Sequence, residues 1–398
     1  MTRVVIIGGG IGGATAGCAL ARAGLEVLVY EAAPELKEIG AGVALHPNAM
    51  RVLRMIGVED AVRRVAGRSE WSATHNWRTG RVISKISRAQ QAAMFGLSGA
   101  TVHRADLLDV IAAALPAGSV TLGKRCSTVE SHGDVAVARF EDGSEIEADV
   151  IIGADGIHSR VRAALFGPDD PRFTGKICYR SVIPIDAVAG ARPATDNAQW
   201  LGPHGTVVLY PVRAEELINV VCHYDDEHYR HESWINECDR QEVLDRYSGW
   251  HESLLRIFEA GDTWYKWALY LTATRSRNGR GGGITVLGDA AHPMLPYLGQ
   301  GACQAIEDGA VLATALSAEP HDLSVGLARY ERTRRPRASR VVLAARERGA
   351  SNHLSSPLTA YKRDITIALR RRFGKDTEGR GAGWIPEYDA TSPDVLAS

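Results

Sequence analysis

The sequence has almost no net charge, which argues against nucleic acid as its partner. Its 398 residues include 46 Lys+Arg and 47 Asp+Glu, a formal net charge of −1, whereas a nucleic-acid-binding protein should carry a basic excess or a clustered basic face. Charged residues make up 23% and hydrophobic residues 45% of the chain. These are ordinary proportions for a globular protein, so extensive disorder is not expected. At roughly 150 residues per domain, the length suggests two or three domains.

Closely spaced cysteines and long apolar runs are also missing. The six cysteines occur without a C-x-x-C pair or a Cys/His group at zinc spacing, so we expect no metal site and interpret the thiols as buried groups in a reducing compartment. No stretch of 18 apolar residues without charge occurs, so no membrane span is predicted. The small and apolar run 4–20 contains six glycines and resolves into strand, turn and helix rather than a signal peptide. We therefore expect a soluble, cytoplasmic protein.

The first thirty residues predict a βαβ unit. Residues 4–7 form a β-branched run that is typical of a buried parallel strand. Residues 11–23 are small and suit a helix, with Gly24 as its stop. Residues 25–30 form a second apolar strand. This alternation predicts an α/β domain that begins at the N-terminus.

The glycines between the first strand and the helix match the G-x-G-x-x-G fingerprint, with Gly12 inside the pattern. Gly8 permits a tight turn, Gly10 lets a pyrophosphate approach the backbone, and Gly13 allows the helix to pack closely on the strand. Glu31 follows 18 residues after Gly13, at the end of the second strand, where a carboxylate can accept both hydroxyls of a ribose. The pattern predicts a dinucleotide site and does not distinguish FAD from NAD.

Two further motifs favour FAD. Residues 151–162 contain D-G-x-x-S-x-x-R, beginning at Asp155, directly after a predicted strand. Further along, a second strand ends at Gly-Asp289, where the carboxylate can accept a ribityl hydroxyl. Gly301 and Ala302 then open a helix whose amides can stabilise negative charge on a reduced isoalloxazine. An NAD dehydrogenase does not need this second anchor, so the three motifs together predict an FAD site.

The rest of the chain predicts a β-rich layer and a helical C-terminus. Alternating polarity around a turn at Thr79-Gly80 predicts a hairpin, and residues 177–185 and 206–224 are also strand-like. We predict a discontinuous FAD-binding domain of residues 1–70, 98–172 and 275–340. A β-rich substrate domain comprises residues 71–97 and 173–274, and a C-terminal helical region comprises residues 341–398.

Taken in order, these motifs resemble those of FAD-dependent aromatic hydroxylases of the para-hydroxybenzoate hydroxylase type, the group A flavoprotein monooxygenases. The resemblance covers nearly the whole chain and includes Gly40-Ala41-Gly42 and residues 103–107. Residues 293–302 and 384–389 look most like the salicylate, 3-hydroxybenzoate and 6-hydroxynicotinate hydroxylase branch. The resemblance implies an α/β fold: a Rossmann-like FAD-binding domain with an inserted β-sheet substrate domain and a helical C-terminal region.

The resemblance also implies cofactors and residue roles. The family binds FAD tightly, uses NADH or NADPH as a transient co-substrate, and reacts with O2 to give a C4a-hydroperoxyflavin. That species hydroxylates a phenolic or hydroxypyridine-type aromatic substrate, often a carboxylate. Carried over by position, Gly12 and Glu31 contact the ADP half of FAD, Val43 lies against the flavin, Arg104 meets the phosphate or ribityl region, Asp155 is linked to FAD and the reduced nicotinamide, Asp289 binds the ribityl chain, and Ala302 meets the flavin ring edge.

The substrate side departs from the branch at one important position. Relatives often place a histidine where this chain has Thr206, as a base near the ring hydroxyl, whereas the following Tyr210 is retained. His204 lies two residues from Thr206 and His223 lies on the next predicted strand, so either can substitute, although a structural role for each stays open. We predict Tyr210 as the catalytic residue, relayed by His204, with Tyr297 as the second choice.

Other interpretations stay open at this stage. They are another FAD-dependent oxidoreductase of the same fold (a urate-type hydroxylase, an isoprenoid reductase or a halogenase) and a non-catalytic FAD-binding protein. Halogenases carry W-x-W-x-I-P, of which this chain has only residues 383–386. Arg180 or Arg213 can hold a substrate carboxylate, and a structural or surface pairing is the equal alternative. The sequence leaves the individual aromatic substrate and the oligomeric state, a homodimer included, undecided.

Overall fold

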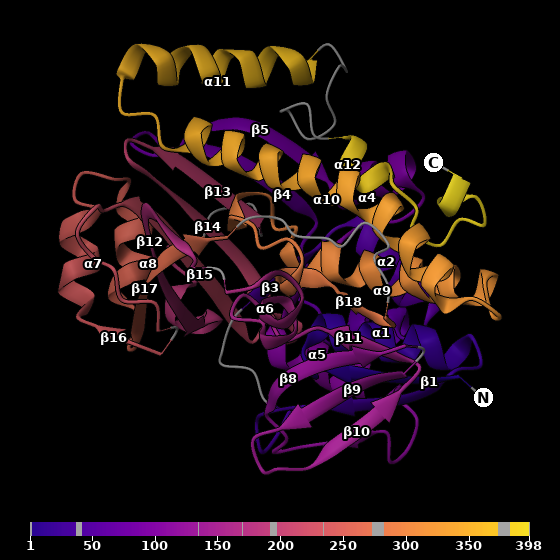
Figure 1. Ribbon diagram of the computed structural model, residues 1–398. Coiled ribbons are helices and arrows are strands. Elements are labelled where there is room, and N and C mark those ends of the chain that lie inside the picture. The colour runs from indigo at the N-terminus through magenta and orange to yellow at the C-terminus, as the bar shows by residue number, and fades with distance from the viewer. Residues whose placement is uncertain are drawn as a thin grey trace.

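The computed structural model describes residues 2–36, 42–133, 135–168, 170–191, 197–233, 235–272, 282–372 and 383–397. Within these ranges the chain forms sheets of five, three, eight and two strands, with helices between and above them (Figure 1). Gly40, Ala41 and the predicted boundary at residues 274–275 lie outside the described residues. The α/β class that the motifs predict is confirmed.

The five-stranded sheet is parallel and covered on both faces. Its strands run in the order β18-β11-β1-β2-β7. Val4 and Ile6 of β1 share a core with the helices on one face, whereas Val5 and Ile7 share a core with the three-stranded sheet on the other. A strand covered on both faces needs a continuous apolar run. The elements are β1 Arg3–Ile7, β2 Glu26–Tyr30, β7 Val120–Thr121, β11 Val150–Gly153, β18 Ile284–Val286, the helices α1 Ile11–Arg22, α5 Arg104–Ala112 and α9 Gly301–Ala318, and the antiparallel strands β8 Cys126–His132, β9 Val135–Phe140 and β10 Glu145–Ala148.

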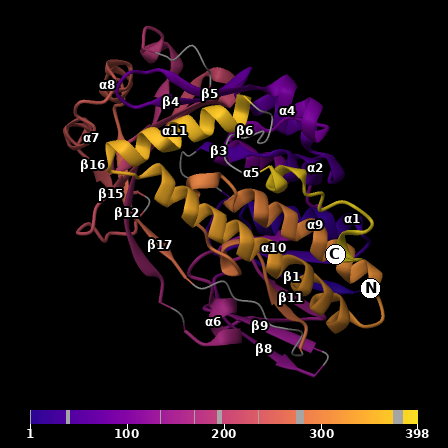
Figure 2. The same cartoon turned by 90° about the horizontal axis from the view of Figure 1, so that it is seen from above.

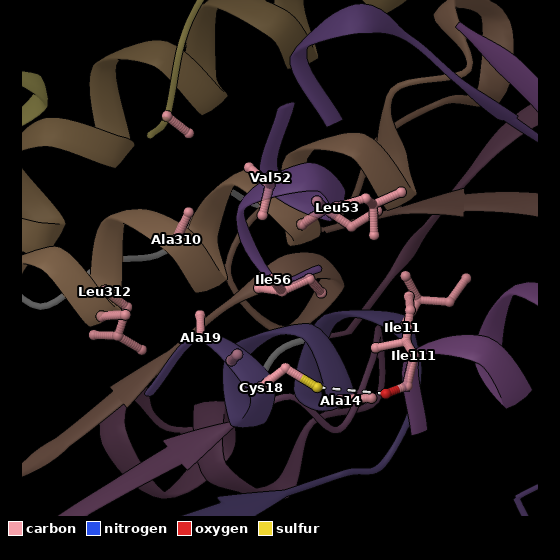
Figure 3. Packing of buried hydrophobic residues seen from close by; sticks show 14 of the residues in the cluster. Ile11, Ala14, Cys18, Ala19, Val52, Leu53, Ile56, Ile111, Ala310 and Leu312 are labelled. Carbon is pink, nitrogen blue, oxygen red and sulfur yellow. Dashed lines mark hydrogen bonds between the residues drawn. The ribbon is translucent and has the colours of Figure 1, made fainter. Parts of the chain in front are cut away.

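Helices α1 and α9 approach each other closely because small residues line their contact. A Cβ on Gly309 of α9 would lie 2.9 Å from the backbone nitrogen of Ala16 in α1. On another side of α1, the Cys18 thiol donates a hydrogen bond to the carbonyl oxygen of Ile111 in α5 at 3.4 Å (Figure 3). Burial raises the pKa of Cys18 to about 11. The six cysteines are free, and five of them are buried as expected, whereas Cys238 is partly exposed.

The eight-stranded sheet unites two distant segments of the chain, as predicted. Its order is β16-β17-β12-β15-β14-β13-β4-β5. One face packs on helices α7 and α8 through an aromatic core that includes Trp200, Tyr247 and Trp264, and the other face lines a cavity. The strands β13, β16 and β17 were not predicted from the sequence. The elements are β4 Trp71–Asn76, β5 Val82–Ser87, β12 Arg172–Pro184, β13 Asn197–Gly202, β14 Gly205–Val212, β15 Leu217–Asp225, β16 Glu237–Cys238, β17 Trp264–Leu271, α7 Arg240–Arg246 and α8 Glu252–Glu259.

Helices α10 and α11 lie across the top of the molecule, as the view from above shows (Figure 2). Helix α10 (Leu323–Asn352) packs on α9 and passes without a break through the predicted boundary at residue 341, and α11 (Pro357–Arg372) lies against β5. None of the helices in the described ranges is long and apolar enough to cross a membrane. The other elements are β3 Gly42–Leu45, α2 Pro47–Met55, α3 Glu59–Val65, α4 Arg88–Phe95, β6 Ala100–His103, α6 Arg160–Phe166, η3 Gly288–Ala290, η4 Pro296–Leu298 and α12 Trp384–Glu387.

Candidate active site

The glycines between β1 and α1 are needed for different structural reasons. Gly8 has φ +107°, which side chains rarely adopt. A Cβ on Gly13 would lie 1.9 Å from the carbonyl oxygen of Gly8, and one on Gly12 would lie 2.9 Å from Leu287. A Cβ on Gly10, in contrast, would meet nothing within 4 Å. Gly8, Gly12 and Gly13 are therefore explained by the turn and its packing, whereas the open space at Gly10 fits a ligand that approaches the backbone.

Glu31 organises this turn from the end of β2. Its carboxylate accepts hydrogen bonds from the backbone N–H groups of Gly9 at 2.6 Å and Ala33 at 2.9 Å. Glu31 does not line the cavity described below. The structure thus shows a support for the glycine turn, and the predicted contact of Glu31 with a ribose stays a prediction.

The D-G-x-x-S-x-x-R residues organise the loop after β11. The Asp155 carboxylate accepts hydrogen bonds from the Ser159 hydroxyl and from the backbone N–H of Arg160 at 2.7 Å, at the start of α6. Burial raises the pKa of Asp155, while these hydrogen bonds oppose the rise. The Arg162 guanidinium donates to the carbonyl oxygens of Ile157 and, at 3.2 Å, of Ala290. Arg162 therefore joins this loop to the one that carries the Gly-Asp motif, a role that the sequence motif alone did not reveal.

Asp289 lies in η3, shortly after β18, and lines the cavity. Its side chain is exposed to that space but surrounded by protein, so burial raises its pKa, and the positive charges of Arg104 and Arg162 counteract the rise. A carboxylate in this setting can accept a hydroxyl hydrogen bond from a ligand. The placement suits the predicted ribityl contact, which no contact in the structure tests.

A buried ionic network holds the Asp289 loop against α9 and α10. The Asp308 carboxylate accepts from the N–H of Gly288 at 2.8 Å and lies 2.7 Å from His292 Nε2 and 2.7 Å from Arg334 Nε. Burial lowers the pKa of His292, but Asp308 outweighs that effect and the net shift is upward. Burial has the opposite effect on Asp308 and raises its pKa, but the neighbouring cations His292 and Arg334 outweigh burial and lower this pKa to about 2. His292 is thus a structural residue, and Asp308 and Arg334, which no motif marked, fix the loop.

A cavity of about 490 Å³ lies between these loops and the eight-stranded sheet. This volume is in the range of small-molecule and cofactor sites. From the side of the glycine motifs it is lined by Gly10, Gly12, Val43, Arg104, Asp289, Gly301 and Ala302. From the side of the sheet and η4 it is lined by Arg180, Gln199, Val208, Tyr210, Val221, His223 and Tyr297. The structure therefore brings most of the predicted cofactor residues together with two of the predicted catalytic residues.

The cofactor side of the cavity fits FAD. Two helices, α1 and α9, begin at it, and neither has an acidic residue in its first turn, so both N-termini can face negative charge. A Cβ on Gly301 would meet nothing within 4 Å, which leaves room beside the first turn of α9, as at Gly10 in α1. Val43 and Arg104 complete this wall. The arrangement suits a long anionic cofactor that spans both helix ends.

The substrate-side residues form regular rows on one face of the eight-stranded sheet. Arg180 pairs with Val221, Val221 with Val208, and Val208 with Gln199, on four adjacent strands. Because side chains on one row of a sheet point to the same face, these residues line the cavity together. The wall therefore combines an apolar centre with polar groups at either end.

Tyr210 lies in the next row and packs directly on Gly42. A Cβ on Gly42 would lie 2.4 Å from Cε2 of Tyr210 and 2.8 Å from its hydroxyl oxygen. The backbone N–H of Gly42 donates to Asn219 Oδ1 at 2.8 Å, and Asn219 is the cross-strand partner of Tyr210. Burial raises the pKa of Tyr210 to about 12, against a lowering by Arg180. Tyr210 is thus a protonated hydroxyl in the cavity wall, held beside β3.

The two candidate histidines lie in different surroundings. His223 pairs directly with Thr206 across β14 and β15 and lines the cavity. Neither ring nitrogen of His223 has a hydrogen-bond partner among the described residues, and burial lowers its pKa to about 3. His204 has φ +59° in the turn before β14, and its side chain is 51% exposed. His204 does not line the cavity, so the structure does not bring it to Tyr210 as predicted. His223 is the cross-strand partner of Thr206, the position where relatives often have a histidine.

The two candidate arginines also lie in different surroundings. Arg213 is exposed and pairs with Asp106 at 2.9 Å. Arg180 lines the cavity, and its guanidinium carbon lies 5.4 Å from the centre of the Trp267 ring. No acidic side chain of the described ranges forms an ion pair with Arg180. A cation without an acidic partner in a cavity wall suits an anionic ligand. Of the two arginines, Arg180 is thus the one in position to meet a carboxylate.

Comparison with known proteins agrees with this arrangement. The model of the FAD binding domain family matches residues 1–345. The chain is 37% identical over 346 residues to a 6-hydroxynicotinate 3-monooxygenase from Pseudomonas fluorescens, which covers 85% of this chain and 89% of that protein. It is also 37% identical over 376 residues to a 3-amino-4-hydroxybenzoate 2-monooxygenase from Streptomyces platensis, with 93% of each protein covered.

Among solved structures, a salicylate hydroxylase substrate complex superposes with a TM-score of 0.83. The two share 27% sequence identity, and the match covers 100% of this chain and 98% of that chain. The motifs, the cavity between two helix N-termini and these relatives therefore lead to one assignment. The chain belongs to the FAD-dependent aromatic hydroxylases of the para-hydroxybenzoate hydroxylase type.

Proposed function

We propose that the protein is a single-component monooxygenase that uses NADH or NADPH and O2 to hydroxylate a phenolic or hydroxypyridine-type aromatic carboxylate. One oxygen atom is added to the aromatic ring, the other leaves as water, and NAD(P)H supplies the two electrons. The observation that carries the proposal is the shared cavity: most of the predicted FAD residues form one wall, and Arg180, Tyr210 and His223 lie on the opposite wall.

FAD, when bound, supplies the redox chemistry with O2 and NAD(P)H. The chain's own residues hold it: Gly10 and Gly301 leave room at the two helix N-termini, and Asp289 accepts a ribityl hydroxyl. Glu31 and Asp155 fix the two loops, and in the proposal Glu31 also meets the ribose of FAD, while Asp155 meets FAD and the reduced nicotinamide. These assignments, and the division into the three domains given above, are part of the proposal.

The substrate class follows from the opposite wall. Arg180 receives the carboxylate, because it is a cation in the wall without an acidic partner in the described part of the chain. Tyr210 and His223 meet the ring hydroxyl, since both lie on the same face of the sheet, two rows apart. The two relatives named above act on 6-hydroxynicotinate and 3-amino-4-hydroxybenzoate, which both combine a hydroxyl with a carboxylate. The same combination fits this cavity.

A substrate panel tests the proposal. The FAD-loaded protein is mixed with 6-hydroxynicotinate, 3-amino-4-hydroxybenzoate, salicylate or 3-hydroxybenzoate, and NADH or NADPH consumption is compared with product mass and H2O2. Three comparison compounds each lack one feature: benzoate lacks the ring hydroxyl, phenol lacks the carboxylate, and uric acid lacks the phenol. We expect a hydroxylated product from at least one of the four acids. If none is hydroxylated, or if uric acid alone is, the proposal fails.

Arg180→Gln and Arg213→Gln form a matched pair for the carboxylate contact. Arg180→Gln should raise KM for the preferred acid at least about tenfold, equivalent to ~1.4 kcal/mol, because a charge-assisted hydrogen bond is lost. Arg213→Gln removes an exposed ion pair with Asp106, which contributes about 0–1 kcal/mol to stability, and should leave KM unchanged. An equal KM in both variants would place the carboxylate elsewhere.

A further inference from the structure

The cavity extends past the apolar centre of its sheet wall, over β4 and β5 at one edge of the sheet. The row that contains Val208 and Gln199 continues with Thr74 on β4 and Ser84 on β5, and all four residues line the cavity. Val208 and Ser84 are three strand spacings apart, or about 14 Å at the usual distance between neighbouring strands. A hydroxybenzoate that lies against Val208 is too short to reach Ser84. This end of the cavity can therefore receive part of a larger ligand.

Polar side chains line this end of the cavity. Thr74 and Ser84 carry hydroxyls, and the neighbouring row adds Asn197 and Ser72, which also line the cavity. Within the described part of the chain, none of these four side chains forms a hydrogen bond. Polar groups in an enclosed space usually have partners, and the open space beside these four can hold the polar atoms of a ligand. We refer to these four residues and Arg88 as the polar end of the cavity.

Arg88, the first residue of α4, brings a positive charge to the polar end. Its guanidinium donates to Ser69 Oγ from Nε at 3.2 Å and from Nη2 at 3.0 Å, and to Gln91 Oε1 from Nη1 at 3.0 Å. Both acceptors are neutral, and no acidic side chain of the described ranges forms an ion pair with Arg88. Burial, with a smaller contribution from the positive charge of Arg63, lowers the pKa of Arg88 to about 10, so the group is cationic at neutral pH. Because a guanidinium has five N–H donors, two of them are left for a ligand.

The phosphates of FAD do not account for this charge. A Cβ on Gly99 would lie 3.3 Å from Arg88 Nη1, so the guanidinium lies beside the start of β6. Arg104, which we expect to meet the phosphate or ribityl region of FAD, follows the other end of β6. The five residue steps from Gly99 to Arg104 span about 16 Å in an extended strand. An anion at Arg88 thus belongs to a ligand other than the cofactor.

We propose that Arg88 binds a second acidic group of the substrate, at the end of an arm that leaves the ring and passes Gln199 and Thr74. The proposal rests on the proposed function, because the ring itself must lie beside the flavin. The ring hydroxyl and the first carboxylate keep their places beside Tyr210 and Arg180. The substrate class is therefore a hydroxyaryl acid with a polar arm that ends in a carboxylate, rather than a simple hydroxybenzoate.

The surroundings favour a polar, anionic arm over an apolar or a cationic one. An apolar arm would cover the hydroxyls of Ser72, Thr74 and Ser84 without giving them partners, which is unfavourable. A cationic arm would be repelled by Arg88. A carboxylate accepts charge-assisted hydrogen bonds from a guanidinium, which are stronger than those between neutral groups. An amide along the arm can both donate to and accept from the hydroxyls, so an amide followed by a carboxylate matches the order of groups along the cavity.

Two phenolic acids with a succinyl arm test the proposal. They are 3-amino-4-hydroxybenzoate and 5-aminosalicylate, each joined through its amino group to one end of succinic acid. In the two comparison compounds, the free carboxylate of the arm is replaced by a carboxamide of nearly equal length. Titration of the FAD-loaded enzyme, followed by flavin absorbance, gives the Kd of each compound. The Kd of the carboxamide divided by that of the carboxylate is the charge ratio, which measures recognition of the arm's charge alone.

In wild type, the charge ratio should be at least about ten for one of the two acids, because a charge-assisted hydrogen bond is gained. Arg88→Gln should bring the ratio to about one, because the charge is lost. Arg81→Gln, which changes an exposed arginine of the same hairpin, should keep the wild-type ratio. Arg180→Gln should weaken the binding of carboxylate and carboxamide equally and so also keep the ratio.

A charge ratio near one for both acids in wild type overturns the proposal, and so does a ratio that Arg88→Gln leaves unchanged. If the ratio is lost in Arg180→Gln instead, or if neither succinyl acid binds while its parent acid does, the proposal is also wrong. Should Arg88→Gln not retain FAD, Arg88→Lys replaces it: lysine cannot make the bidentate contact, so a reduced ratio supports the proposal and the wild-type ratio overturns it. These outcomes concern binding alone and differ from failure of the proposed function, in which none of the panel acids is hydroxylated.

Discussion

Gly10→Ala offers a direct test of the cofactor wall, because no neighbouring side chain explains the glycine. Gly10 has φ −66° and ψ −177°, which alanine adopts without strain. A Cβ there would meet nothing within 4 Å. If the space belongs to the FAD pyrophosphate, the added methyl group occupies the position of a phosphate oxygen or pushes it away from the amides of α1. The substitution should therefore affect FAD binding much more than folding.

The expected magnitudes follow from the geometry. Gly10 is the N-cap residue of α1, where alanine is less favourable than glycine, so the apoprotein should lose about 0.5–1 kcal/mol. Displacement of the pyrophosphate should weaken FAD affinity at least about tenfold, or ~1.4 kcal/mol. The assays are the fluorescence change of FAD on titration with apoprotein, which gives Kd, and the Tm of the apoprotein.

Gly13→Ala is the matched control in the same turn. Its Cβ would lie 1.9 Å from the backbone carbonyl oxygen of Gly8, which cannot move aside as a flexible side chain would. Such overpacking costs typically about 1–3 kcal/mol, so the apoprotein Tm should fall clearly below that of Gly10→Ala. Wild-type FAD affinity in Gly10→Ala would refute the assignment of this space to the cofactor, and a Tm loss as large as that of Gly13→Ala would refute the packing argument.

Three other substitutions probe the remaining walls. Asp289→Ala leaves a ribityl hydroxyl unpaired at a cost of about 1–3 kcal/mol, so the protein should lose FAD on dilution; full yellow occupancy would contradict the contact. Tyr210→Phe keeps the ring and removes the hydroxyl, so FAD reduction by NAD(P)H should persist while the ratio of product to NAD(P)H falls and H2O2 rises; an unchanged ratio would make Tyr210 a packing residue. Gly42→Ala places a Cβ 2.4 Å from the Tyr210 ring and should lower the same ratio by displacing that ring; a normal ratio would show that the position of Tyr210 is not critical.

The elements that the sequence predicted well are those whose cause is local. The strand 4–7 and the strand before Asp289 are short apolar runs that end at glycine, and both are found as β1 and β18. Strands covered on both faces are mostly apolar, and the one polar residue here, Thr285, donates its hydroxyl to Glu331 Oε1 at 3.1 Å. β13 was missed although polar Asn197 and Gln199 alternate with apolar Ala198 and Trp200, because four alternating residues are the shortest run that indicates a strand. Gln199, on the polar side of that alternation, belongs to the cavity wall.

Contacts between residues far apart in the chain could not be predicted from the sequence for a different reason. Arg334 and Asp308 lie 26 residues apart on two helices and meet at 2.7 Å, and neither position carries a motif. Their contact depends on how α10 crosses α9, which is decided by packing along both helices. Even a correct assignment of both helices does not give that pair, and the loop that carries Asp289 depends on it.

The histidine shows how sheet register controls the chemistry of a site. From the sequence, both His204 and His223 can replace the histidine absent at Thr206, and the predicted relay to Tyr210 uses His204, two residues away along the chain. Adjacent residues of a strand point to opposite faces, and a turn residue points away from both, so proximity in sequence is a poor guide to proximity in a cavity. The register of β14 with β15 places His223 directly opposite Thr206, where Cβ atoms of paired residues are about 4.5–5.5 Å apart. An imidazole can thus be supplied to nearly the same space from either strand. Thr206, whose hydroxyl donates to the Trp200 carbonyl at 2.8 Å, is then free to serve packing alone.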